Sequence, residues 1–143
     1  MMVKSLNLVA VADMEGALAE VAGVGRPGGW FYVSEPIFAG AFNEIACLYN
    51  DEGVVRAAAQ AALDRALAAG GFWSAEHEQR FAQPSHFKNW DDFVERMLYP
   101  SFADLGITPE LSERVQAAFE PHCGADGADF LRLMHARLLR RKG

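Results

Sequence analysis

The run Trp30–Val33 (WFYV) constrains the fold of this 143-residue chain more than any other segment. Its aromatic and β-branched residues favour a strand, and apolar and polar side chains do not alternate along it. A strand of this kind is usually covered on both faces, as in a parallel sheet between helices. Pro27-Gly28-Gly29 comes directly before it and favours a tight turn. We therefore expect a buried strand over Trp30–Ser34.

A second strand and a helix are expected before this one. Val3–Val11 is apolar and rich in β-branched residues. Asp13 is a candidate N-cap for a helix that places Met14 and Leu18 on one face. The resulting strand–helix–strand unit predicts parallel pairing of its two strands through a right-handed crossover.

The remaining elements continue the alternation of helices and strands. Expected N-caps are Asn50 for a helix over 51–69, Asn89 for another helix, and Thr108, followed by Pro109, for a third. An irregular helix is expected over 37–50. Strands are expected over 72–83, polar on both faces and so at a sheet edge, and over 130–139. This order predicts one α/β domain with a mostly parallel sheet.

Composition excludes several classes of function. The net charge of −6 and the pI near 5.1 speak against a nucleic-acid binder, which needs a basic surface. Cys47 and Cys123 have no C-x-x-C spacing, which suggests a reducing compartment. No apolar run reaches the roughly 18 residues of a membrane span. The short apolar N-terminus is interpreted as a strand, not a signal peptide, and the expected location is the cytoplasm.

The usual catalytic and cofactor motifs are missing from the sequence. The four histidines share no ligand spacing, so no metal site is expected. Neither a G-x-S-x-G elbow nor a P-loop occurs. The clustered glycines over 23–29 follow a helix and precede a strand. A dinucleotide-binding loop needs the opposite order, so they are interpreted as a helix stop and a turn.

Aromatic residues offer a candidate pocket. Phe38 and Phe42 could line it, and His86 lies near an expected strand-to-helix junction where loops can carry ligand contacts. The alternative is that the aromatic side chains belong to the core and that His86 is exposed.

The quoted features together resemble one family. The segment KSLNLVAVADMEGALAEVAGVGRPGGWFYVSEP is similar to the middle of class I S-adenosylmethionine-dependent methyltransferases, in which an R/K-P-G-G turn leads to a strand ending in S-E-P. The segments HFKNWDDFVERML and GADGADFLRLMHARLLRR resemble later parts of that fold. The resemblance implies a partial Rossmann-like sheet with strands 4-5-7-6, strand 7 antiparallel, and flanking helices. Strand 4 would be Val3–Val9.

The resemblance also implies where a site would lie. Ser5, Leu6 and Asn7, at the end of strand 4, would be the part of the S-adenosylmethionine site present here. Substrate-binding residues would be Glu35, Phe38, Phe42 and His86, with a small-molecule acceptor.

The chain departs from the family pattern in its cofactor-binding half. The glycine-rich loop after strand 1 and the acidic residue ending strand 2 are not in the sequence, and Asn7-Leu8 stands where histidines are common. Residues 1–143 are therefore expected to form a truncated domain that lacks the N-terminal cofactor-binding half and is inactive by itself.

An unpaired strand edge leads to a further expectation. In the whole family sheet, strand 4 pairs with strand 1, so the Val3–Val9 edge would be open to a second copy of the chain as a homodimer. The alternatives are a non-catalytic interaction module that binds a partner through this edge, and an unrelated small α/β binding protein with a pocket near Phe38, Phe42 and His86.

Overall fold

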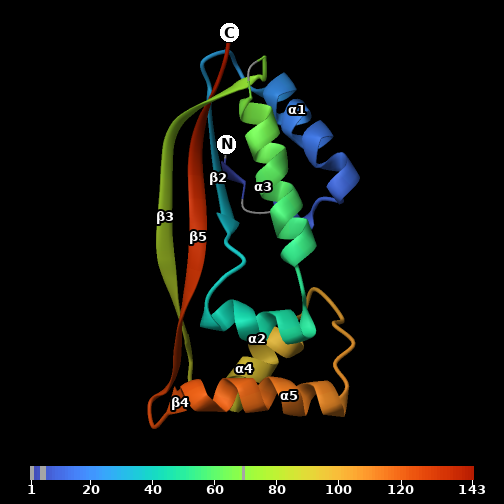
Figure 1. Ribbon diagram of the computed structural model, residues 1–143, viewed down its shortest axis with the longest axis vertical. Coiled ribbons are helices and arrows are strands. Elements are labelled where there is room, and N and C mark those ends of the chain that lie inside the picture. The colour runs from blue at the N-terminus through green and yellow to red at the C-terminus, as the bar shows by residue number, and fades with distance from the viewer. Residues whose placement is uncertain (1, 4–5, 69) are drawn as a thin grey trace. The chain divides into compact units, whose positions relative to one another are not determined.

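The computed structural model describes residues 2–3, 6–68 and 70–143 (Figure 1). The chain divides into two compact units, which are described separately below. The first unit consists of Met1–Phe38, Glu52–Phe81 and Leu133–Gly143, and the second of Ala39–Asp51 and Ala82–Arg132. The division falls within two long strands, so each of these strands contributes residues to both units.

The described chain contains both helices and strands. The strands are β1 (Met2–Val3), β2 (Trp30–Pro36), β3 (Trp73–Phe87), β4 (Cys123–Gly124) and β5 (Gly127–Arg141). The α-helices are α1 (Met14–Val24), α2 (Ala41–Tyr49), α3 (Gly53–Leu67), α4 (Trp90–Phe93) and α5 (Pro109–Phe119). Short 3-10 turns cover Leu6–Leu8, Val11–Asp13 and Glu120–His122, and a π-helical turn, Val94–Leu98, continues α4.

The described strands form one sheet in the order β1–β2–β5–β3, with β4 paired to β5. β1 and β2 are parallel, with Met2 opposite Tyr32. β2 and β5 are antiparallel, with Trp30 opposite Arg140. The expected strand order and the antiparallel direction of the last strand are confirmed. The expectation of a mostly parallel sheet is wrong, because β5 is antiparallel to β2 along the whole length of β2.

The buried strand expected at Trp30–Ser34 is confirmed as β2, which extends to Pro36. Phe31, Val33, Ser34 and Glu35 are all buried. Both faces of the strand are therefore covered toward its C-terminal end, as the absence of alternation predicted.

The first strand is shorter than expected. β1 ends at Val3, whereas Leu6–Leu8 forms a 3-10 turn. The Leu6 side chain is buried in the core, and its backbone N–H donates to Glu35 Oε1 at 2.9 Å. A backbone group that bonds to a side chain in this way is not available for a strand ladder, so the strand does not continue to Val9.

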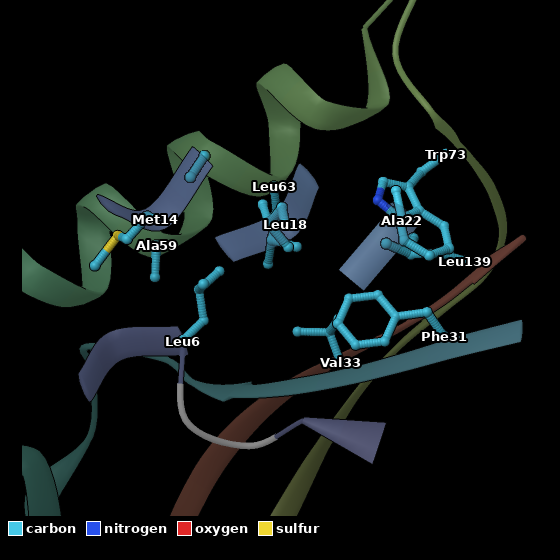
Figure 2. Packing of buried hydrophobic residues seen from close by; sticks show 11 residues of the cluster. Leu6, Met14, Leu18, Ala22, Phe31, Val33, Ala59, Leu63, Trp73 and Leu139 are labelled. Atoms are coloured by element: carbon cyan, nitrogen blue, oxygen red, sulfur yellow. The ribbon is translucent and has the colours of Figure 1, made fainter. Parts of the chain in front are cut away.

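The core of the first unit lies between its sheet and the helices α1 and α3 (Figure 2). Leu18 and Leu63 point from the two helices toward Phe31 and Val33 on β2 (Figure 2). Trp73, at the start of β3, is 5.2 Å from Phe31 between ring centroids. Burial of these side chains is the main force that holds the helices on this face of the sheet.

The core of the second unit is aromatic. Phe87, Phe93, Phe119 and Phe130 are buried together, with ring centroids 4.8–6.4 Å apart in the recorded pairs. Its other buried members come from α2, α5, the π-helical turn after α4, and β5; they are Phe42, Ile45, Val115, Leu98 and Ala128. Offset and edge-to-face ring pairs of this kind add to the energy of simple burial.

Two of the four expected helix caps form. Thr108 Oγ1 accepts from Leu111 N at 3.1 Å, and Asn89 Oδ1 accepts from Asp92 N at 2.9 Å. Asp13 makes no side-chain cap, because it closes a 3-10 turn directly before α1. Asn50 follows the end of α2, and Glu52 takes the N-cap position of α3.

Candidate functional site

A cleft of about 400 Å³ opens in the first unit, beside the start of α3. The chain just after β2 forms one wall, α3 forms another, and β3 and β5 contribute charged side chains. The lining residues are Pro36, Ile37, Phe38, Gly53, Arg56, Ala57, Gln60, Asp64, Arg80, His135 and Arg137. Its volume lies in the range of sites that hold small molecules.

Arg137 is the buried charge of this cleft. Its side chain is 10% exposed, and it donates from Nη1 to Asp64 Oδ1 at 2.6 Å and from Nη2 to Gln60 Oε1 at 2.8 Å. Its Nε–H is buried and has no hydrogen-bond partner among the described residues. Gln60 and Asp64 are one helical turn apart on α3, so both side chains reach the same guanidinium group.

His135 lies on the same face of β5 as Arg137, because side chains two residues apart along a strand share a face. Its Nε2 lies 2.5 Å from Glu78 Oε1 on β3. The imidazole is 6% exposed, while Glu78 is 54% exposed and lies 3.9 Å from Arg80. A histidine oriented by a carboxylate beside a cleft is a group that can accept or donate a proton.

Arg56 brings another positive charge to the start of α3. Its guanidinium contacts Glu52 Oε2, with Nη2 at 2.7 Å and Nε at 2.9 Å. The N-terminal end of the helix carries a partial positive charge from its aligned peptide dipoles. Three guanidinium groups and one carboxylate, that of Asp64, thus line the cleft.

The predicted cofactor-binding residues are only partly described. Ser5 lies outside the described residues, and Asn7 lies in the 3-10 turn Leu6–Leu8. Leu6 and Glu35 are brought together by the hydrogen bond from Leu6 N to Glu35 Oε1. Both side chains are buried, at 3% and 2% exposure, so in this structure they hold the end of β2 against the turn after β1.

The predicted substrate-binding aromatic residues fall in different units. Phe38 lies in the first unit, is 44% exposed, and lines the cleft. Phe42 lies in the second unit and is buried, where its ring stacks on Phe87 with centroids 6.2 Å apart. Arg132 also packs over the Phe42 ring, 5.1 Å from its centroid.

His86 lies in the second unit at an exposed position. Its Nδ1 is 2.8 Å from Asp129 Oδ1, and its carbonyl accepts from Arg96 Nη1 at 2.7 Å. Arg96 also contacts Asp92 Oδ2 at 3.2 Å. The pKa of Asp92 is lowered, chiefly because its carboxylate accepts from Lys88 N and also because it pairs with Arg96.

Sequence reasoning missed the charged residues of the cleft. His135 and Arg137 lie within the strand expected over 130–139, and Gln60 and Asp64 lie within the helix expected over 51–69. Their spacings of two residues on a strand and four on a helix place each pair on one face. Those spacings were the available signal, but they do not show which helix face meets which strand.

Two other kinds of site are not found in the described part of the chain. No group of three or more His, Cys, Asp or Glu side chains is placed to hold a metal ion. Among the same residues, no helix is long and apolar enough to cross a membrane.

Two solved structures have a similar fold. One is a protein from Bacillus halodurans C-125 that is provisionally described as a methyltransferase. It is 10% identical with a TM-score of 0.53, and the match covers 92% of this chain and 64% of that one. The other is the YcgJ protein from Bacillus subtilis, at 14% identity and a TM-score of 0.50, with 92% of this chain and 59% of that one covered.

The chain therefore shares its fold with these proteins and spans less than two thirds of the length of either. No protein-family model and no curated protein matches the sequence.

Proposed function

We propose that the chain forms the acceptor-side part of an S-adenosylmethionine-dependent methyltransferase for a small molecule, and that it does not transfer a methyl group by itself. The observation that carries this proposal is the fold, which follows a protein provisionally described as a methyltransferase over 92% of the chain. The strand order β1–β2–β5–β3 supports it, because it is the order expected if these are strands 4-5-7-6 of the family sheet. The S-E-P sequence at the end of β2 adds a motif to the likeness in fold.

Inactivity of the chain alone follows from what methyl transfer requires. The reaction is an in-line attack on a positively charged sulfonium, and the protein accelerates it mainly by positioning the two reactants. The family holds its cofactor through a glycine-rich loop that links a strand to a helix, and the sequence has no such segment. Ser5, Leu6 and Asn7 would touch only one side of the cofactor.

The acceptor is proposed to bind in the cleft of the first unit, next to the C-terminal end of β2. Phe38 supports this assignment, since it both lines the cleft and is accessible. Glu35, Phe42 and His86 remain proposed as substrate-binding residues. Two free thiols, Cys47 and Cys123, fit the proposed cytoplasmic location, which is reducing.

Titration with S-adenosylmethionine tests the proposed function. Isothermal titration calorimetry of the folded chain is expected to show no saturable binding at micromolar concentrations, because the main cofactor partners are missing. The same ligand solution titrated into a complete methyltransferase of this fold is the control. Tight one-to-one binding to this chain would overturn the proposal that its cofactor site is incomplete.

An interaction module is the second candidate function. The observation in its favour is that β1 ends the strand order, so one of its sides has no neighbour in the described sheet. The homodimer proposed through the Val3–Val9 edge then pairs β1 with its two-fold copy, over the two residues, Met2 and Val3, that are in strand conformation.

Sedimentation equilibrium at micromolar concentration tests this pairing. A dimer is expected, and Val3→Pro, which removes one backbone N–H donor from β1, is expected to shift the population toward monomer. A chain that sediments as a monomer at this concentration would contradict the proposal.

A further inference from the structure

We propose that the cleft of the first unit binds a small organic oxyanion, a carboxylate or phosphate carried on an apolar group, with Arg137 and Arg80 as its cationic partners. The identification of this ligand as a methyl acceptor rests on the proposed function above. The binding itself rests on the cleft alone.

The buried guanidinium of Arg137 is the centre of the argument. A guanidinium has five N–H groups. In Arg137, each of the two terminal nitrogens donates one hydrogen bond to a protein side chain. The Nε–H is buried without a partner among the described residues. The one carboxylate that pairs with it, Asp64, is 67% exposed, so solvent screens its charge. An oxyanion that accepts from the remaining N–H groups of the two terminal nitrogens would place a second negative charge beside this buried guanidinium.

The other charges around the cleft favour the same ligand. Arg80 lines the cleft from β3, and its contact with Glu78 is long at 3.9 Å. Arg56, near the positive N-terminal end of α3, also lines the cleft. Glu52 and Glu78 are already in contact with Arg56 and His135, respectively. A cation would meet three guanidinium groups here, whereas an anion meets one lining carboxylate.

The apolar wall indicates an organic ligand. Pro36 at the end of β2, and Ile37 and Phe38 directly after it, line the cleft together with Ala57 of α3. Phe38 is 44% exposed and offers its ring to a ligand. An inorganic ion would leave these apolar side chains exposed to water, whereas the ring or chain of an organic acid would cover them.

Calorimetry with matched small ligands tests the inference. Benzoate and phenyl phosphate are titrated into the whole chain, and benzamide, which has the shape of benzoate without its charge, is the neutral comparison. At least one of the two anions is expected to bind one-to-one and about tenfold or more tightly than benzamide, because charge-assisted hydrogen bonds are roughly twice as strong as neutral ones. The tighter of the two anions identifies the ligand as a carboxylate or a phosphate.

Three variants locate the binding. Arg80→Gln changes an exposed side chain and is expected to weaken anion binding severalfold without affecting the fold. Arg137→Lys keeps the positive charge but removes the planar set of guanidinium N–H donors. It is expected to weaken anion binding about tenfold or more. Arg65→Gln is the matched control, because it removes one positive charge from the exposed face of α3, where Arg65 pairs with Glu15, away from the cleft. It is expected to leave anion binding unchanged.

Two results would overturn the inference. One is that neither anion binds more tightly than benzamide. The other is that Arg80→Gln and Arg65→Gln weaken binding equally, which would mean that only net charge matters. Circular dichroism shows whether Arg137→Lys folds. If it does not, the comparison of Arg80→Gln with Arg65→Gln still shows whether the anion binds in the cleft. These results are independent of the S-adenosylmethionine titration, so failure of one proposal does not imply failure of the other.

Discussion

Phe93→Ala is expected to lower the free energy of unfolding by about 3–5 kcal/mol, the range for removing a fully buried phenylalanine. Phe93 has no exposed surface and lies at the centre of the second unit's core. Its ring centroid is 4.9 Å from that of Phe87 and 4.8 Å from that of Phe119. The substitution leaves a cavity that these rigid rings cannot close, so the loss exceeds the transfer energy of the side chain alone.

Urea unfolding followed by circular dichroism measures this effect, with Phe102→Ala as the matched control. Phe102 is 88% exposed in the same unit, and the same chemical change there is expected to alter stability by less than about 0.5 kcal/mol. A loss below about 1 kcal/mol for Phe93→Ala would show that the aromatic cluster is not packed as described.

Gly127→Ala is expected to be the second large effect, through the backbone instead of the core. Gly127 begins β5 with φ +96°, in the left-handed region that side chains rarely adopt. A Cβ atom there would lie 2.2 Å from the Phe87 carbonyl oxygen and 2.9 Å from that of Lys88. Backbone strain alone costs about 1–3 kcal/mol, and displacement of two backbone oxygens adds to it.

The control for this variant is on the other side of the same turn. Gly124 pairs with Gly127, and a Cβ atom at Gly124 would approach no other atom closer than 4.0 Å. Gly124→Ala is therefore expected to change the melting temperature little, while Gly127→Ala lowers it by several degrees or more. Equal melting temperatures for the two variants would contradict the close approach of β5 to the end of β3.

Local sequence signals predicted those parts of the fold that local chemistry controls. Trp30–Val33 has strong strand propensity and no polar position, and it forms the covered strand β2. Thr108 with Pro109, and Asn89 with Asp92, have the residue types and spacing that begin helices, and both form caps. The polar stretch after Phe72 was expected at a sheet edge, and β3 ends the strand order.

Elements that depend on distant partners were predicted less well. The stretch Val3–Val9 has strand propensity, yet tertiary packing buries Leu6 and bonds its N–H to Glu35, 29 residues away. β3 and β5 extend beyond their expected ends. In β5 the added residues, such as Ala128, are buried in the second unit's core, which a periodicity pattern does not reveal.

The sequence by itself determined most of the helices and strands and, through the R-P-G-G-strand-S-E-P pattern, which fold they resemble, because turn, cap and strand preferences act over a few residues. Only the tertiary structure decided which charged residues come together in the cleft. Arg137 meets Asp64 and Gln60 across 73 and 77 positions of sequence, and His135 meets Glu78 across 57. Contacts of that separation depend on how α3 packs against the sheet and on which strands become neighbours, and no local pattern specifies either.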